Sequence, residues 1–111
     1  MRATDTSQLR KGVLEIAVLA LLDASDSYGR QLVERLGGVP GLLAGPGTVY
    51  PLLTRLEKNG LVTTAWRDSP QGPPRKYYCL TPRGRRHLAA QAAAWDQLHD
   101  ALTTVLREVS R

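Results

Sequence analysis

The side chains of this sequence that could do chemistry are mostly basic, and they are concentrated in one segment. Residues 46–87 carry eight Lys and Arg residues against two acidic ones, a local charge of +6. The rest of the 111-residue chain carries seven basic and eight acidic residues, a charge of −1. Such localisation is typical of a surface that binds a polyanion. The eight basic residues are Arg55, Lys58, Arg67, Arg75, Lys76, Arg83, Arg85 and Arg86.

Residues suited to catalysis or metal binding are sparse. The only histidines, His87 and His99, lie twelve residues apart, and no Gly-rich phosphate loop follows a predicted strand. The single cysteine, Cys79, excludes an internal disulfide and a multi-cysteine zinc site. Because it lies in a strand-like stretch, we expect it to be a small buried apolar residue. The sequence therefore predicts neither an enzyme nor a metal site, and no cofactor.

Three helices are predicted in the first half of the chain. The first covers about residues 11–22 and is apolar nearly all round, so it needs two packing partners. Ser27 is expected to cap a short second helix that ends at the Gly pair 37–38. After a flexible connection over residues 41–47, a third helix is expected from residues 47–48 to the stop signal at 59–60.

A β-hairpin is predicted after the third helix. Residues 61–67 and 76–80 have the character of strands, and the segment between them contains three prolines and a glycine. Tyr77 and Tyr78 should point to opposite faces of this ribbon, with Tyr78 in a structural role. Three helices followed by a two-stranded ribbon are typical of a winged helix-turn-helix module.

The remaining residues predict one long helix. Thr81 and Pro82 fit its cap and first position, and no proline interrupts it up to about Val109. At about 1.5 Å per residue it would be roughly 40 Å long, more than the small domain can cover. Its apolar residues recur at steps of three and four, which predicts a dimerisation helix. The predicted seam is Leu88, Ala92, Trp95, His99, Leu102, Leu106 and Val109.

The predicted fold is therefore mainly α with a two-stranded wing. We expect a winged helix-turn-helix domain over residues 1–81 and a C-terminal dimerisation helix over residues 82–111.

Six short motifs in this order resemble the PadR-type transcriptional regulators, in particular their short, single-domain members. This resemblance implies a homodimer that binds palindromic promoter DNA, usually as a repressor relieved by a small molecule. The uncharged tip of the predicted wing, residues 69–74, departs from the pattern and argues against a deep minor-groove contact by the tip. The motifs are residues 9–12, 27–29, 46–61, 75–78 and 80–84, and Trp95.

The residues expected to contact double-stranded DNA lie on the third helix and the wing. Hydroxyl, Arg and Lys side chains can reach base edges and phosphates in a major groove about 12 Å wide, and wing cations can flank the backbone. The alternatives are a solvated helix face, a charged strand edge that prevents aggregation, and a Tyr50 that braces the helix. The candidates are Thr48, Tyr50, Pro51, Thr54, Arg55 and Lys58 on the helix, and Arg67, Arg75 and Lys76 on the wing.

Three arginines near the start of the last helix need compensation. Arg83, Arg85 and Arg86 lie where the helix dipole disfavours cations. Either DNA phosphates or acidic residues of another element should neutralise them, and the sequence leaves both alternatives open.

An effector site is predicted at the middle of the dimer helix. Planar aromatic ligands stack well on tryptophan, and multidrug-binding relatives use an aromatic residue at the dimer interface in this way. The alternative is that Trp95 only fills the interface, and that His99 either fixes the helix register or packs without a further role. The candidate effector residues are Trp95, Ala92 and His99.

Two functions are compatible with these patterns. The favoured one is a cytoplasmic, sequence-specific DNA-binding repressor, since the longest apolar run, residues 16–22, is too short to span a membrane and the N-terminal residues lack a secretion signal. The alternative is a winged-helix protein-interaction module that does not read DNA. The basic third helix separates them, because a protein-binding version would tolerate neutral residues at Arg55 and Lys58.

Overall fold

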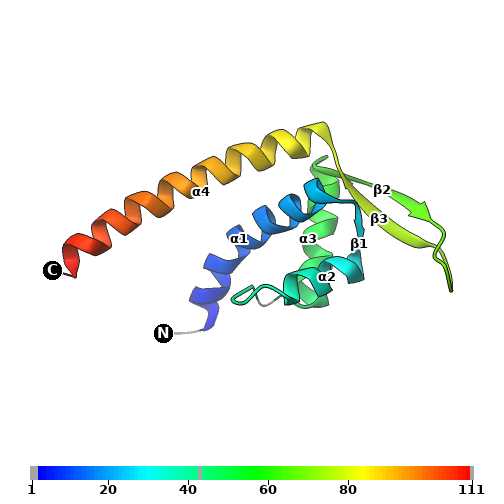
Figure 1. Ribbon diagram of the computed structural model, residues 1–111, viewed down its shortest axis with the longest axis horizontal. Coiled ribbons are helices and arrows are strands. Elements are labelled where there is room, and N and C mark those ends of the chain that lie inside the picture. The colour runs from blue at the N-terminus through cyan, green and yellow to red at the C-terminus, as the bar shows by residue number, and fades with distance from the viewer. Residues whose placement is uncertain (1–2, 43, 111) are drawn as a thin grey trace.

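The computed structural model describes residues 3–42 and 44–110. These residues form four helices and three strands (Figure 1). Residues 1–2 and 111, at the ends of the two predicted domains, and residue 43, in the predicted connection, lie outside the described residues. In chain order the elements are α1 (Ala3–Ala24), β1 (Ser27–Tyr28), α2 (Gly29–Gly37), α3 (Pro46–Lys58), β2 (Val62–Arg67), β3 (Arg75–Leu80) and α4 (Pro82–Val109).

One apolar core joins α1, α2, α3 and the sheet. Each of these helices carries apolar residues at steps of three and four, which places them on one face. Full burial of one such side chain contributes about 1.5–3 kcal/mol, so this cluster dominates the stability of the domain. The core residues are Leu14, Val18, Leu19, Leu22, Leu32, Leu36, Val49, Leu52, Leu53, Leu56, Leu61, Val62 and Tyr78.

Helix α1 is longer than predicted. The expected start near residue 11 is wrong, because the helix begins at Ala3 and ends at Ala24. The first eight residues of α1 are mostly polar and show no apolar periodicity, which is why the pattern missed them. Once a helix is nucleated by its packed part, each added residue contributes a further backbone hydrogen bond, so a polar extension can form.

The sheet has a third strand that the sequence did not predict. Its order is β1-β3-β2, all antiparallel, and Ser27 pairs with Tyr78. The prediction that Ser27 caps α2 is wrong, since Tyr28 occupies the N-cap position and makes no side-chain cap bond. Ser27 is instead buried, and its Oγ accepts a hydrogen bond from Nη1 of Arg35 at 2.9 Å.

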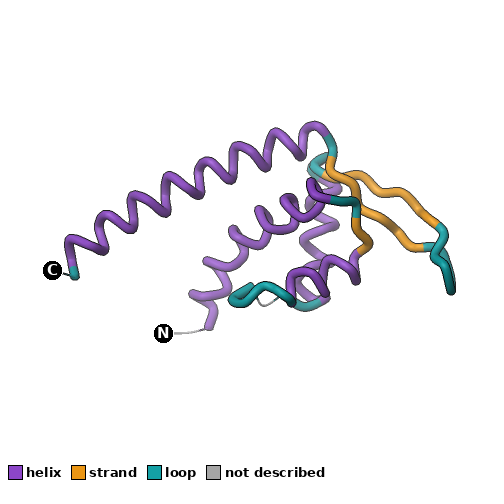
Figure 2. The backbone as a smooth tube through the Cα atoms, in the orientation of Figure 1, coloured by secondary structure: helices purple, strands orange, loops and turns teal. Residues whose placement is uncertain are grey.

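Helix α4 begins as predicted and then leaves the domain. Thr81 accepts a hydrogen bond from the Gly84 N–H at 2.9 Å, and Pro82 follows it. The free end of α4 and the β2–β3 hairpin project in opposite directions (Figure 2). The radius of gyration is therefore 16.2 Å, whereas a compact chain of this length would have about 13 Å. One residue of the predicted seam, Leu88, is partly buried and packs against the core of its own chain.

Candidate nucleic-acid interface

Helix α3 turns one face into the core and a polar face outward. Its buried residues are Val49, Leu52, Leu53 and Leu56. Opposite them, Pro51, Thr54 and Lys58 are exposed at steps of three and four, so they form one outward stripe. This stripe is the part of α3 that another molecule can reach most directly.

One flank of α3 faces α1. Arg55 Nη2 lies 4.0 Å from Oε2 of Glu15, and 53% of the Arg55 side chain remains exposed. Lys11, Thr48 and Pro51 line a cleft of about 280 Å³ beside this pair. Arg55 is therefore held loosely next to a basic cleft, and it can still reach an external anion.

The other flank of α3 faces the wing. The Tyr50 ring covers Gly29 so closely that a Cβ there would overlap the ring, while 43% of Tyr50 stays exposed. Thr54 Oγ1 donates a hydrogen bond to the Tyr50 carbonyl oxygen at 3.1 Å. Glu57 Oε2 accepts a hydrogen bond from Thr64 of β2 at 3.3 Å. Tyr50 thus braces α3 against α2 and also presents a surface to a partner.

The three predicted wing contacts lie on two faces of the sheet. Trp66 pairs with Lys76, and Arg67 pairs with Arg75, so alternation along the strands separates Lys76 from the two arginines. The face with Lys76 also carries Thr64, which contacts α3. Only Lys76, of the three predicted cations, therefore lies on the face turned toward α3.

Arg67 has a partner within the chain. Its Nη2 donates to Oδ2 of Asp26 at 2.7 Å, and its guanidinium lies 4.5 Å from the Tyr77 ring centroid. This hydrogen bond lowers the pKa of the Asp26 carboxyl. On the same face, the Arg75 guanidinium lies 4.5 Å from the Tyr28 ring centroid. Aromatic rings and a carboxylate thus hold these two arginines close to the sheet.

Two strand predictions have different outcomes. Tyr77 and Tyr78 lie on opposite faces, and Tyr78 is in the core, as predicted. The prediction for Cys79 is wrong, because it is only half-buried and its Sγ lies 3.8 Å from Nη2 of Arg67. It faces away from the core since it alternates with Tyr78. Partial burial raises the pKa of its thiol.

The arginines of α4 are compensated in different ways. Arg85 Nε lies 3.1 Å from Oδ1 of Asp23, so an acidic residue of α1 neutralises it. Within residues 9–42 and 44–110, no carboxylate oxygen lies within 4.0 Å of the Arg83 or Arg86 nitrogens. Acidic compensation therefore accounts for one of the three residues.

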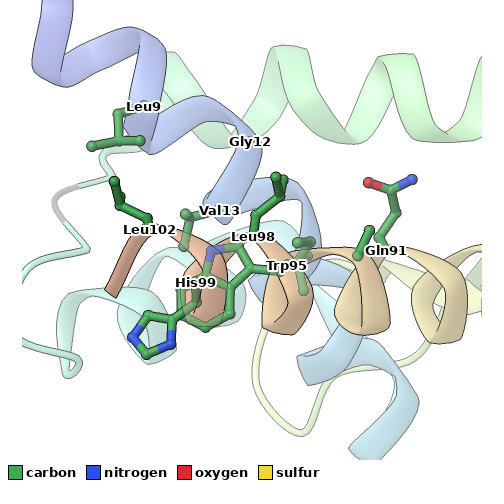
Figure 3. Close-up of a pocket in the computed structure, with 10 residues that line it drawn as sticks. Leu9, Gly12, Val13, Gln91, Trp95, Leu98, His99 and Leu102 are labelled. Carbon is green, nitrogen blue, oxygen red and sulfur yellow. The ribbon is translucent and has the colours of Figure 1, made fainter. Parts of the chain in front are cut away.

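A groove between α1 and α4 contains two of the three predicted effector residues. Trp95 and His99 stack with ring centroids 5.0 Å apart and an interplanar angle of 16°. They line a volume of about 380 Å³ together with Val13 of α1 (Figure 3). Ala92 is not among the residues that line this groove, although its spacing places it on the same face of α4 as Trp95 and His99.

Helix α4 presents a broad apolar face to solvent, and the groove occupies part of this face. Exposed residues recur at steps of three and four, which keeps them on one side of the helix. This face includes Leu98 and Val105, which were not part of the predicted seam. Leu98 directly precedes the seam residue His99, and Val105 directly precedes Leu106. The exposed large apolar residues of α4 are Trp95, Leu98, Leu102, Val105, Leu106 and Val109.

A family profile matches the part of the chain that builds these surfaces. The transcriptional regulator PadR-like family matches residues 18–90, from α1 through the sheet to the start of α4. The chain belongs to the PadR-like family. The resemblance predicted from the motifs is thus confirmed, and the family is one of transcription regulators rather than of enzymes.

Individual PadR-like relatives support the same assignment. The chain is 30% identical over 91 residues to the transcriptional regulator Rv3488 of Mycobacterium tuberculosis, covering 82% of this chain and 83% of the relative. It is 36% identical to a solved PadR family transcriptional regulator from Eggerthella lenta, with a TM-score of 0.81 and coverage of 94% and 90%. It is 31% identical to a solved PadR-like transcriptional regulator from Bacillus cereus, with a TM-score of 0.81. The match covers 89% of this chain and 96% of the Bacillus protein. The predicted winged-helix fold with a long C-terminal helix is confirmed.

The structure also reveals residues of this PadR-like chain that sequence reasoning missed. Glu15 and Asp26 pair with two of the predicted DNA-contact arginines, from positions 40 and 41 residues away. Trp66 is 69% exposed on the wing. Among the residues that the structure describes, no helix is both long and apolar enough to cross a membrane.

Proposed function

We propose that this PadR-like chain is a sequence-specific DNA-binding repressor that acts as a homodimer on a palindromic promoter site. The observation that carries the proposal is the outward stripe of α3, with Thr54 and Lys58 exposed and Arg55 beside them. A helix with such a face fits the major groove. A regulator that reads DNA in a bacterial cell works in the cytoplasm.

The side chains on α3 divide into two kinds of contact. Thr48, Thr54 and Arg55 can hydrogen-bond to base edges, whereas Lys58 and the N-terminal turn of α3 suit phosphates. Tyr50 and Pro51 shape the surface beside them. On the wing, Lys76 contributes a phosphate contact, Arg75 lines the same groove as Lys76, and Arg67 adds positive charge from the far face.

Dimerisation is supported by the apolar surface of the isolated chain. The total solvent-accessible surface of the isolated chain is 7763 Å², whereas a compact monomer of 12.2 kDa would have about 6100 Å². Leu98, Leu102 and Val105 on α4 are exposed, and Leu9 on α1 is also exposed. A second copy packed on this face would bury them. Truncation after Ala90 should therefore give an unstable or aggregating chain.

A two-fold dimer would match a palindromic site. Two copies of α3 related by a two-fold axis can read two half-sites about 34 Å apart, one turn of DNA. Because α4 joins the copies and follows β3 directly, its angle sets the distance between the two α3 helices.

The groove that holds Trp95 and His99 is the proposed effector site. A planar aromatic compound could stack on this pair, with the apolar side chains of α1 opposite. Such a ligand would relieve repression only if it binds one arrangement of α4 more tightly than the other, with a typical coupling of about 1–3 kcal/mol.

The test combines a gel shift with a sedimentation measurement. DNA from upstream of the chain's own gene should be retarded by the intact protein, with two chains per site. Sedimentation at micromolar concentration should give a dimer. A monomer under these conditions, or the absence of any shift, would contradict the proposal.

The second candidate is a winged-helix module that binds another protein. The broad apolar face of α4 would suit such a role. The two functions differ in salt dependence, because DNA binding releases counterions and weakens steeply with added salt, whereas apolar association does not.

A further inference from the structure

The face of the wing that looks toward α3 contains an exposed tryptophan. Trp66 of β2 is 69% exposed and sits opposite Lys76 of β3. Thr64 lies on the same face, and its hydrogen bond to Glu57 shows that this face is the one turned toward α3. Large aromatic side chains are usually covered in folded proteins, so a ring this exposed beside a basic residue invites a partner.

Trp66 lines a groove whose charge is entirely positive. The groove has a volume of about 230 Å³ and runs between the wing, α3 and the first turn of α2. Tyr50 lines it from α3 and Arg30 from α2. Lys76 and Arg75 line it from the wing. No acidic residue is among the described residues that line it, and no acidic residue lies in the first turn of α2. Glu57, on the α3 flank, is held by Thr64 outside the groove lining.

The cations of this groove are available to an external anion. Arg30 and Lys76 have no carboxylate oxygen within 4.0 Å among the described side chains. Lys76 Nζ lies 5.7 Å from the Tyr78 ring centroid, which leaves the ammonium at the groove rather than in an ion pair. Arg67, on the other face, pairs with Asp26. The two faces of the wing therefore differ in what they can bind.

We propose that the sugar-phosphate backbone of DNA runs through this groove, with Trp66 packed on a deoxyribose and with Arg30 and Lys76 paired to the phosphates on either side. A sugar is an apolar surface between two anions, and the groove offers an apolar ring between two cations. Such contacts position the protein on the duplex and carry little sequence information. This inference rests on the proposed DNA-binding function and adds Trp66 and Arg30 to its contact surface.

The test uses Trp66 as its own reporter. In a Trp95→Phe variant, Trp66 is the single tryptophan, and acrylamide quenching measures its exposure. Adding DNA from upstream of the chain's own gene, with binding followed independently by the anisotropy of labelled DNA, should protect Trp66 from the quencher. A scrambled duplex at low salt should protect it as well, because the contact is with the backbone.

Two variants give a second readout. Lys76→Ala should lower the slope of log affinity against log salt by about one, and Trp66→Ala should weaken binding with little change in that slope. Arg107→Ala removes one positive charge at the far end of α4 and should leave the slope unchanged.

The outcomes separate this inference from the proposed function. Binding by anisotropy with Trp66 as accessible as in the free protein would overturn the inference and leave the function standing. If Trp66 becomes protected from acrylamide as the protein concentration rises without DNA, the groove is a contact between copies of the chain. That result would also overturn the inference. Absence of binding to any duplex would overturn the proposed function, and the inference with it.

Discussion

Glu15 of α1 and His87 of α4 lie in hydrogen-bonding contact, with Oε1 3.1 Å from Nε2. The second oxygen of the same carboxylate lies 4.0 Å from Nη2 of Arg55 on α3. One side chain of α1 thus touches both the helix proposed to join the two copies and the helix proposed to enter DNA. A change in the position of α4 can reach Arg55 through this carboxylate.

This contact predicts that Glu15→Gln strengthens DNA binding. The carboxylate competes with phosphate for Arg55, and removing its charge leaves the guanidinium to the DNA. Because Arg55 is largely exposed, solvent screens the pair and the gain should not exceed about 1 kcal/mol, or roughly fivefold in affinity. Titration of labelled operator DNA at low salt measures the gain.

The gain should vanish in the Arg55→Ala background, since the two substitutions act through one contact. Glu108→Gln, at the far end of α4, is the charge-matched control. An equal gain with and without Arg55 would mean that Glu15 acts only through net charge.

A second prediction concerns the effector groove. Titration with planar cationic and phenolic aromatic compounds should quench the fluorescence of the Trp66→Tyr variant, because Trp95 remains in the groove. The Trp95→Tyr variant should show no such quenching, since Trp66 lies on the wing. If a compound releases the protein from DNA equally well after Trp95→Ala, the effector acts elsewhere.

Gly84 gives a test of the junction between the sheet and α4. A Cβ at this position would overlap the backbone carbonyl oxygen of Leu61, which cannot rotate away. Gly84→Ala should therefore lower the free energy of unfolding by about 1–3 kcal/mol, despite the better helix propensity of alanine. Urea denaturation measures it. Gly37→Ala, where nothing lies within 4 Å of the added Cβ, should change stability by less than about 0.5 kcal/mol.

The pair of Asp26 and Arg67 predicts a small dependence of stability on pH. The pKa of Asp26 is held below its ordinary value of 3.8 by Arg67, so the pair contributes stability above that pH and loses it as the pH falls below. Asp26→Asn should thus destabilise the protein only slightly near neutral pH, because both groups are exposed and solvent screens the pair. The difference from the wild type should shrink below about pH 3.8. A difference that stays constant with pH would show that the ion pair contributes nothing.

The sequence predicted the elements with strong periodicity and missed those set by distant contacts. The apolar spacing of α3 and the Thr81–Pro82 start of α4 are local, and both are confirmed. Strand β1 has two residues and exists only because β3 lies beside it, so no local pattern marks it. Leu88 fits the seam pattern, yet proximity to the core decides its packing.

The same distinction holds for the candidate interface. Exposure of Thr54 and Lys58 follows from the period of α3 alone. The pairing of Arg67 with Asp26 joins residues 41 positions apart, and the sheet that brings them together was only partly predicted. Strand alternation alone predicts that Lys76 and Arg75 lie on opposite faces, just as it predicts the opposite faces of Tyr77 and Tyr78.

Whether α3 reads DNA is tested by the operator affinity of the Arg55→Ala, Lys58→Ala double variant over a range of salt concentrations. Circular dichroism and sedimentation must first show that the variant remains folded and has the oligomeric state of the wild type. Loss of a base contact should cost about 1–3 kcal/mol, and loss of a phosphate contact should lower the salt slope by about one. Both losses should occur together in the double variant. A folded double variant with wild-type affinity and wild-type salt dependence would contradict it.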